Sequence, residues 1–436
     1  MKISKLHIDK FRHLENLDFD FTYQSGERKG QPLDKICFIG QSATGKTGLL
    51  DLIFDFSKQA LNSQVIQDKY LMNHVILNGE IQFKINDDLY IQKQDTVTFK
   101  DKLYITANAS GSINSIVPYE DRKATIYFKA NLISENNIDI FTKNPIDIFE
   151  KYNQLTSIRL ENLLEPHEYA TLFNDNVEPE MWILLLQEIL EYRKKFNQKM
   201  SELIHKGLLA NPKKLSSEFE NWQKDNPNKL QSFADKFNPI LEKLNLEIDL
   251  VNTEYTIPIL NKRTEETIPI QNTSTGTKGL LLSFLPLFKL HTKNSIILMD
   301  EPERSLYPDM QMELMNHYKN LAPEAQFIVA THSPFIAASF EPEERFILYF
   351  DNEGKVAVRR GISPIGDDPN DMLFNDFGVN YYNDDVQEKF KEYLGLLDKV
   401  KSESNKELKK KYLLEASKLG NQYNFILDEK NQERLQ

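Results

Sequence analysis

The sequence predicts an α/β fold with buried parallel strands, an inserted helical segment and a helical C-terminal extension. Apolar runs of strand length at 36–39, 296–299 and 325–330 end in small or polar residues, and each precedes a segment with helical spacing. Groups at the C-terminal ends of such strands meet at one edge of a parallel sheet. Near residue 146 the apolar spacing changes from a strand period to a helical one, which indicates a helical insertion.

The composition is typical of a globular chain. Its 436 residues are 40% hydrophobic and 27% charged, enough for about two or three structural units. A formal net charge of −12 disfavours nucleic acid binding by bulk electrostatics, so such binding needs a local patch. Cys37 is the single cysteine, which excludes an intramolecular disulfide or a cysteine-based zinc site. We therefore expect a cytoplasmic protein.

Membrane insertion is not expected. The longest apolar run, Leu280–Phe288, is far shorter than the ~20 residues of a membrane span. The N-terminus also lacks the apolar stretch of a signal peptide.

Residues 1–145 are expected to form a β-rich N-terminal lobe. The alternation of apolar residues over 1–22 predicts two strands joined by a turn around His13–Asn16. Further strands are predicted at 79–95, where Asn86–Asp88 forms a turn, and at 103–107 and 124–130.

Residues 146–250 are expected to form a helical arm. Pro179 begins one helical pattern, about 40 Å long at 1.5 Å per residue, and a second runs over 215–246, so the two would pair antiparallel. The remaining divisions are a C-terminal α/β lobe at 251–361 and a helical extension at 362–436. Strand-like alternation is predicted at 246–260, a hairpin at 346–359 and a tail helix from Asn383 to Gly420.

The stretch from Gly40 to Thr47 fits the pattern G-x-x-x-x-G-K-T between a predicted strand and a predicted helix. In that pattern, backbone N–H groups cradle phosphates, the lysine reaches the β- and γ-phosphates, and the hydroxyl is a ligand of Mg²⁺. The phosphates also meet the positive end of a helix. The alternative is a strand, turn and helix without a ligand. The candidate phosphate-binding residues are Gly40, Gln41, Ser42, Ala43, Thr44, Gly45, Lys46, Thr47 and Gly48.

Asp300 and Glu301 follow a buried apolar strand. Two carboxylates at this place suit a magnesium-nucleotide site, in which the first holds the metal and the second polarises the attacking water as a general base. The alternative is a strand that meets solvent at an acidic turn.

Two further segments carry groups that suit phosphate chemistry. Thr273–Leu282 places small hydroxyl residues and glycines at the start of an apolar helix, where N–H groups attract phosphate. His332 lies at the end of another apolar strand. Taken alone, the first segment could be an ordinary helix cap, and the histidine could be structural.

These four motifs occur in the order and rough spacing of ABC-type ATPase heads, so the chain resembles the SMC/RecF/OLD-like group. The resemblance covers about residues 1–60 and 265–340 and hardly extends to the arm. It implies an ABC-type P-loop ATPase head, with a mixed β lobe and a parallel-sheet lobe, that uses ATP and Mg²⁺.

The resemblance also implies a role for each motif. Lys46 corresponds to the phosphate lysine, Thr47 and Asp300 to the metal ligands, Glu301 to the catalytic base and His332 to the switch histidine. In this group the signature reaches the nucleotide of the opposite subunit, which implies a homo-oligomer built from head-to-head dimers. The signature residues would be Ser274, Gly276 and Lys278.

Three departures point away from transporters of this group. The loop carries Ser42-Ala43-Thr44 instead of Asn-Gly-Ser, and the signature reads Ser-Thr-Gly-Thr-Lys instead of Leu-Ser-Gly-Gly-Gln. Tyr307 stands where transporters carry an aspartate. The glutamine of the Q-loop has no clear equivalent, and a position near residues 126–133 is only a guess.

The arm is much shorter than the coiled coils of chromosome-organising proteins, and the tail lacks the acidic pattern of a TOPRIM nuclease. We therefore expect a separate effector protein, such as a nuclease, as in the antiphage ATPases of the PARIS and Septu types. A weak resemblance of Gly366–Val379 to the tails of those ATPases supports this hypothesis.

Two alternatives remain open. A RecF-like DNA-repair ATPase could use the basic stretch 193–214, which has seven lysines and arginines and one glutamate, to contact nucleic acid. A solvated helix surface explains the same stretch. The other alternative is a nucleotide-locked scaffold with little turnover, although the presence of Glu301 argues against it.

Overall fold

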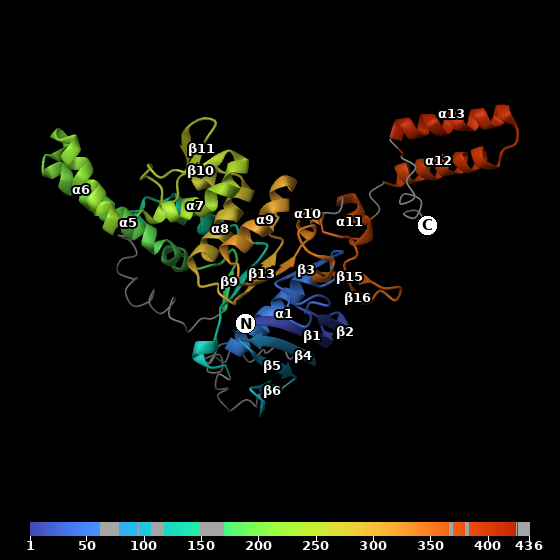
Figure 1. Ribbon diagram of the computed structural model, residues 1–436, viewed down its shortest axis with the longest axis horizontal. Helices are drawn as coiled ribbons and strands as arrows, with labels where there is room; N and C mark the ends of the chain where they lie inside the picture. Colours follow the sequence, from blue (N-terminus) through green and yellow to red (C-terminus); the bar gives the residue numbers. More distant parts are fainter. Residues whose placement is uncertain are drawn as a thin grey trace. The chain divides into compact units, whose positions relative to one another are not determined.

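The computed structural model describes residues 1–61, 78–94, 96–105, 117–145, 147–148, 170–365, 369–379, 383–423 and 425. The chain forms two compact units, Met1–Gly361 and Ile362–Gln436 (Figure 1). The finer division of the first unit into two lobes and an arm stays a prediction. Parts of the predicted arm, of the strand at 103–107 and of the segment Gly366–Val379 lie outside the described residues.

A six-stranded antiparallel sheet forms the β-rich part of the first unit, in the order β2-β1-β4-β5-β6-β7. Its strands are β1 (Lys2–Phe11), β2 (Leu14–Asp20), β4 (Asn78–Ile85), β5 (Asp88–Lys93), β6 (Thr96–Phe99) and β7 (Lys102–Ile105). In β1, Leu6 and Ile8 alternate with exposed or half-exposed neighbours and enter the core, and Ile3 is buried on the other side of a register shift between Ile3 and Lys5. The predicted turn between β4 and β5 is confirmed.

The first unit also contains a seven-stranded sheet, in the order β16-β15-β3-β14-β13-β8-β9. All its neighbours pair in parallel except β15 and β16, which form the predicted hairpin. Its strands are β3 (Lys35–Gly40), β8 (Thr125–Phe128), β9 (Ala170–Phe173), β13 (Ile296–Asp300), β14 (Gln326–Ala330), β15 (Arg345–Phe350) and β16 (Val356–Arg360). Strands from both halves of the sequence therefore build one sheet.

Apolar helix faces cover these sheets. In α1 (Lys46–Leu61), the predicted face of Leu49, Leu50, Ile53 and Phe54 is buried. Four other helices of this unit are α2 (Glu135–Thr142), α8 (Thr275–Lys289), α9 (Pro308–Leu321) and α10 (Pro334–Ala337). The described 3₁₀ turns are η2 (Tyr119–Asp121), η3 (Leu208–Ala210), η4 (Glu242–Leu244), η5 (Ile270–Asn272) and η6 (Pro342–Glu344).

The arm differs in part from the prediction. The first helix, α5 (Pro179–His205), begins at the predicted proline and packs against α6 (Pro212–Asp225) through aromatic rings such as Tyr192 and Trp222 (Figure 1). The prediction of one second helix over 215–246 is wrong, because the chain breaks at 226–228, where Pro227 interrupts the helical hydrogen bonds.

The helix after this break does not continue the arm. In α7 (Lys229–Leu241), Phe233 and Phe237 contact Phe288 and Phe284 of α8, with ring centroids 5.4 and 5.1 Å apart. The apolar face of α7 therefore joins the core of the first unit.

Strand structure at 246–260 is shorter than predicted. It is limited to β10 (Leu246–Ile248) and the first residues of β11 (Ile259–Asn261), which pair with β12 (Glu266–Ile268) in a small antiparallel sheet. The residues between β10 and β11 instead form turns in which Asp249 and Asn252 accept backbone N–H bonds.

The second unit is helical, as predicted, but its tail is a pair of helices. These are α12 (Asp384–Ser402) and α13 (Lys406–Tyr423), preceded by α11 (Pro369–Asn375). Asn405 accepts backbone N–H bonds that start α13, so the predicted single helix from Asn383 to Gly420 is interrupted. The helix also runs past Gly420.

The predicted fold class is confirmed: an α/β head combines an antiparallel sheet and a largely parallel sheet with inserted helices and a helical extension. Among the described residues, no helix is long and apolar enough to span a bilayer.

Candidate nucleotide site

The phosphate loop joins the end of β3 to the start of α1, and its glycines are required by the backbone. Gly40 has φ +141°, and a Cβ there would lie 2.0 Å from the carbonyl oxygen of Leu348. Gly45 has φ +94°, and a Cβ there would lie 2.9 Å from the side chain of Leu14. Any larger residue would strain the backbone and collide with neighbouring strands.

Lys46 is wrapped by this loop. Its Nζ donates to the carbonyl oxygens of Gly40 and Gln41, each at 2.9 Å, and its side chain is buried. Burial lowers the pKa of Lys46 to about 8, while the negative charges of Asp300 and Glu301 oppose that shift. The amine is therefore protonated at neutral pH, at the place where the sequence predicts a phosphate lysine.

Thr47 and Asp300 come together from distant parts of the sequence. The Thr47 hydroxyl donates to the carboxylate of Asp300, 3.1 Å from Oδ1 and 3.0 Å from Oδ2. Asp300 ends the buried strand β13, and burial raises its pKa to about 6; the Thr47 hydrogen bond opposes that rise, whereas Glu301 and Asp51 add to it. The two oxygen ligands predicted for a metal are thus adjacent.

These residues fit a magnesium ion shared with a nucleotide. Mg²⁺ binds hard oxygen ligands and in nucleotide sites takes one or two side chains together with phosphates and waters. In the described part of the chain, no cluster of three or more histidine, cysteine or carboxylate side chains could hold a metal by itself. Thr47 and Asp300 would therefore hold the ion together with substrate phosphates.

Glu301 and His332 flank this pair. The imidazole Nε2 of His332 lies 4.0 Å from Oε1 of Glu301, and both side chains are about two-fifths exposed. Glu301 has φ +48°, an uncommon conformation for a glutamate, and its N–H donates to the carbonyl of Ala330 at 2.8 Å. Burial, and then Lys46, lower the pKa of His332, while Glu301 opposes that shift, so the imidazole is neutral at pH 7.

Glu303 is a site residue that sequence reasoning missed. Its Oε1 accepts hydrogen bonds from the Thr331 hydroxyl at 2.5 Å and from the backbone N–H of His332 at 3.1 Å. Its Oε2 is buried and has no hydrogen-bond partner among the described residues, and burial raises the carboxyl pKa. Glu303 thus ties the segment of His332 to the loop after Asp300.

The turn between β1 and β2 contributes two more residues that were missed. A Cβ on Gly45 would lie 3.2 Å from Nε2 of His13, and one on Gly48 would lie 3.5 Å from Nη1 of Arg12. The Arg12 guanidinium also stacks over the Phe11 ring at 5.0 Å. A cation therefore stands beside the phosphate loop. Nothing in the sequence spacing signals this, because the contact depends on how the antiparallel sheet folds over α1.

The segment after β8, where the Q-loop glutamine was guessed, holds a lysine instead. Lys129 forms an ion pair with Asp51 of α1 at 3.0 Å, and Tyr127 donates to the same carboxylate at 3.2 Å. A cavity of about 50 Å³ joins this segment to Asp300, Glu301 and Gly276. Residues 126–133 thus lie at the site, but none of them is glutamine.

The signature segment is placed differently from the other motifs. Ser274 caps α8, and its Oγ accepts the N–H of Thr277 at 3.2 Å, while Ser274 and Thr275 are exposed. A Cβ on Gly276 would lie 2.6 Å from the carbonyl oxygen of Ser305, so this glycine permits close packing. Over the described residues, no hydrogen bond or ion pair joins Ser274 or Lys278 to the phosphate loop.

The basic stretch at 193–214 is not a uniform cationic surface. Arg193 is buried, and its Nη1 donates to the carbonyl of Asn252 at 2.6 Å. Lys199 and Lys206 both pair with Glu202. The predicted use of Arg193 in phosphate contacts is therefore wrong, because this arginine anchors the arm to the turn after β10.

A family model described as an AAA ATPase domain matches residues 1–337. A search of the curated proteins found no match.

Three solved structures are similar at low identity. An SMC head bound to the C-terminal winged-helix domain of ScpA shows 13% identity, a TM-score of 0.39 and coverage of 83% of this chain and 97% of that one. The SMC head domain from Thermotoga maritima shows 13%, 0.39, 83% and 100% for the same quantities. An SMC head with an extended coiled coil, bound to the C-terminal domain of ScpA from Pyrococcus furiosus, shows 16%, 0.38, 82% and 96%.

Proposed function

Because this chain belongs to the AAA ATPase domain family, we propose that it binds ATP with Mg²⁺ and hydrolyses it to ADP and phosphate. The observation that carries the proposal is the convergence of Lys46, Thr47 and Asp300 at the end of β3, with Glu301 and His332 beside them. Catalysis of phosphoryl transfer relies on positioning and electrostatic stabilisation, and these residues can supply both.

In this proposal each residue has one task. The loop amides and Lys46 bind the phosphates, and Thr47 and Asp300 hold the metal, which neutralises charge on the transferred phosphoryl group. Glu301 accepts a proton from the attacking water as a general base. His332, 4.0 Å from Glu301, would donate a hydrogen bond to the γ-phosphate, and its lowered pKa favours the neutral imidazole. Arg12 stands beside α1 as an additional positive charge.

The proposal includes a site shared between two copies of the chain. Ser274 and Thr275 are exposed at the start of α8, where free N–H groups favour a phosphate. Their own chain offers them no contact with the phosphate loop among the described residues. In a head-to-head dimer, Ser274, Gly276 and Lys278 would therefore complete the site of the opposite copy, so that ATP joins the heads and hydrolysis separates them.

We further propose that this cycle gates or scaffolds a separate effector protein in antiphage defence. The compact helical unit Ile362–Gln436 supports this proposal, because it adds to the ATPase head a second body that an effector could bind. The nucleic-acid alternative is weakened, because Arg193 is buried and Lys199 and Lys206 pair with Glu202. The locked-scaffold alternative does not account for Glu301 beside His332.

The test is the rate of ATP turnover as a function of protein concentration. The wild-type rate per subunit should rise with concentration, and Lys46→Ala and Glu301→Gln should each lower it by about 10²–10⁴-fold. Lys58→Ala, at the other end of α1, and Glu353→Gln, in the β15–β16 turn, serve as matched controls that should keep wild-type rates. Unchanged turnover in Lys46→Ala would contradict the assignment of the nucleotide site.

A rate that does not depend on concentration would separate the two parts of the proposal. Hydrolysis would stand, but the shared site would be abandoned. A wild-type rate of zero at all concentrations, with nucleotide still retained, would favour the locked scaffold.

A further inference from the structure

A second pocket lies at the other end of the parallel strands. Asp34 precedes β3 and Asn294 precedes β13, so both mark the edge of the sheet opposite the phosphate loop. The pocket has a volume of about 320 Å³, near the lower limit for small-molecule sites. It lies where the antiparallel sheet meets this edge, and the polar residues that line it include Lys2, Arg28, Gln31, Lys84, Asn86 and Asp87.

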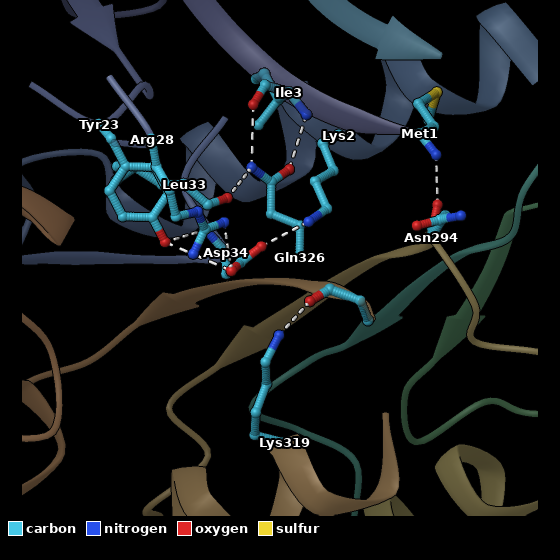
Figure 2. Close-up of polar contacts among 11 residues, drawn as sticks. Met1, Lys2, Ile3, Tyr23, Arg28, Leu33, Asp34, Asn294, Lys319 and Gln326 are labelled. Carbon is cyan, nitrogen blue, oxygen red and sulfur yellow. Dashed lines mark hydrogen bonds and ion pairs between the residues drawn. The ribbon is translucent and has the colours of Figure 1, made fainter. Parts of the chain in front are cut away.

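Two cations of the pocket are held in place by one carboxylate. Asp34 pairs through Oδ1 with Nζ of Lys2 at 2.6 Å and through Oδ2 with Nη2 of Arg28 at 2.7 Å. The Arg28 guanidinium also stacks over the ring of Tyr23 at 4.2 Å. Figure 2 shows Lys2 and Arg28 reaching Asp34 from different segments of the chain. Cations that are oriented before a ligand arrives lose less entropy when they bind it.

One buried side chain holds the backbone segments beside these cations. Figure 2 shows that this side chain belongs to Gln326, the first residue of β14. The amide of this buried residue accepts the N–H of Ile3 at 2.7 Å and donates to the carbonyls of Ile3 and Leu33 at 3.0 and 2.7 Å. One side chain therefore fixes β1, on which Lys2 lies, and the strand-entry loop that carries Asp34.

A third cation is available for a ligand. Lys84 of β4 lines the pocket and is partly exposed, and its ammonium forms no ion pair or hydrogen bond among the described residues. Lys2, Arg28 and Lys84 are countered by Asp87 in the pocket and by Asp34, which pairs with two of them, so one positive charge is in surplus. The N-terminal amine of Met1 also lines the pocket and is not counted, because burial lowers its pKa to about 5. This surplus occurs in a chain with a net charge of −12. The local positive field is therefore not a property of the whole surface.

The surroundings of the pocket limit the size of the ligand. Asn86 donates to Asp121 at 2.8 Å, and Lys100 outside the pocket pairs with Asp88 and Asp121. This acidic rim opposes a long polyanion, whereas a compact anion can reach the cations inside. Guanidinium and ammonium groups from three segments match the several oxygens of a phosphate better than the two of a carboxylate.

From this arrangement we infer that the pocket of Lys2, Arg28 and Lys84 binds a small phosphate-bearing molecule. It is distinct from the phosphate loop and does not depend on the ATPase proposal. The bound group would be a free phosphate or pyrophosphate, or the phosphate of a nucleotide.

The experiment is isothermal titration calorimetry of the full chain carrying Lys46→Ala, so that binding at the phosphate loop is removed. Pyrophosphate and AMP are titrated in magnesium-free buffer. The same titrations are repeated with Lys84→Glu added, and with Lys93→Glu added as the matched control. Lys93 lies on β5 of the same sheet, is exposed and does not line the pocket.

We expect one binding site per chain, a loss of affinity on the order of tenfold in Lys84→Glu, and less than about a twofold change in Lys93→Glu. Tighter binding of AMP than of pyrophosphate would identify a nucleotide ligand, and the reverse would identify the phosphate group alone. Absence of binding to both probes overturns the inference. Equal losses in Lys84→Glu and Lys93→Glu also overturn it, because they would show only unspecific attraction.

Discussion

The two motifs at the starts of helices α1 and α8 are built in contrasting ways. The polar side chains of the phosphate loop have hydrogen-bond partners in their own chain. Lys46 donates to two carbonyls of the loop, and Thr47 donates to Asp300. The signature segment has its glycine buried against Ser305, but Ser274 and Thr275 are exposed. Both motifs lie at the N-terminus of a helix. Among the described residues, only the phosphate loop is hydrogen-bonded to a charged side chain, that of Asp300, within its own unit.

This difference is consistent with the two motifs having different tasks in the proposed shared site. A helix N-terminus attracts phosphate, but the affinity it provides depends on the other groups that surround the ligand. In the proposed site, the phosphate loop and its neighbours would supply groups for binding and proton transfer, whereas the signature would supply N–H groups, the hydroxyls of Ser274 and Thr275, and Lys278. In the proposed shared site, a second copy of the chain would bring both helix N-termini to one ligand.

The largest effect is expected when two inactive variants, one in each motif, are mixed and tested for restored turnover. Ser274→Asp keeps a good N-cap but places a negative charge where phosphate would bind, so turnover should fall by about 100-fold. Lys46→Ala should be at least as inactive. Mixed together, the two variants can form dimers with one intact shared site, and about a quarter of the wild-type rate should return.

Ser274→Asn is the control for this experiment, because asparagine also caps a helix but carries no charge. It should lose much less activity than Ser274→Asp. If the mixture of Ser274→Asp and Lys46→Ala stays inactive while both variants dimerise, the signature does not act across subunits.

The next largest effect is expected at Glu303, which ties the segment of His332 to the loop after Asp300. Glu303→Ala removes the acceptor for Thr331 and for the N–H of His332, so kcat should fall about tenfold with little change in KM. Glu303→Gln should restore most of kcat, because its Oε1 can accept the same two bonds. Failure of glutamine to restore activity would contradict a positioning role.

A smaller effect is expected from pH. Below pH 6 Asp300 takes up a proton and holds a metal less well, and above pH 8 Lys46 loses the charge that attracts phosphate. The value of kcat/KM for ATP should therefore be bell-shaped, falling to about half of its maximum near each of these values. A flat profile between pH 5 and 9 would contradict these two assignments.

The same pKa of Asp300 predicts a stability effect with a defined sign. Since the folded pKa is raised above that of the unfolded chain, the folded state is penalised where Asp300 is ionised, above about pH 6, and not below the unfolded pKa. Asp300→Asn should therefore raise the melting temperature at pH 7.5 relative to wild type. It should have no such advantage near pH 4.

The smallest effect on turnover is expected at the base of the arm, far from both motifs in sequence. Trp182 is fully buried, and its Nε1 donates to Oδ1 of Asn137 at 3.1 Å. Trp182→Phe leaves that oxygen without its donor and should lower the free energy of unfolding by about 1–3 kcal/mol, with turnover unchanged. Circular dichroism during urea unfolding measures the loss.

Trp222→Phe is the matched control for this prediction. Trp222 packs against Tyr192 and Phe219, and no hydrogen bond of its indole is found in the described part of the chain. Its replacement should cost clearly less than that of Trp182. Equal costs would show that the hydrogen bond to Asn137 does not matter.

Sequence patterns predicted the parts of the fold that depend on local chemistry. The strand, glycine loop and helix around Gly40–Thr47 have a recognisable order, and the buried strand before Asp300 is a continuous apolar run. The proline that begins α5 and the turn between β4 and β5 were predicted for similar reasons. Such features are determined by neighbouring residues.

Features that depend on distant contacts could not be predicted. Periodicity does not reveal that α7 leaves the arm to pack on α8, or that Arg193 points inward to Asn252. Glu303 is acidic and follows a strand, so it resembles a solvent-exposed turn residue until Thr331 is placed beside it. The roles assigned to the nucleotide-site residues stay predictions that the experiments above would test.

The root of the arm has a mechanical consequence. Asn137, which holds Trp182 near the start of α5, also donates to the carbonyl of Leu132, and Leu132 lines the cavity next to Asp300. Arg193 fixes α5 a second time, to the turn after β10, so only about 18 Å of the helix, from Arg193 to His205, extend beyond both anchors. A shift of Leu132 beside the carboxylates would therefore reach the root of the arm through Asn137, while Arg193 holds the helix farther along.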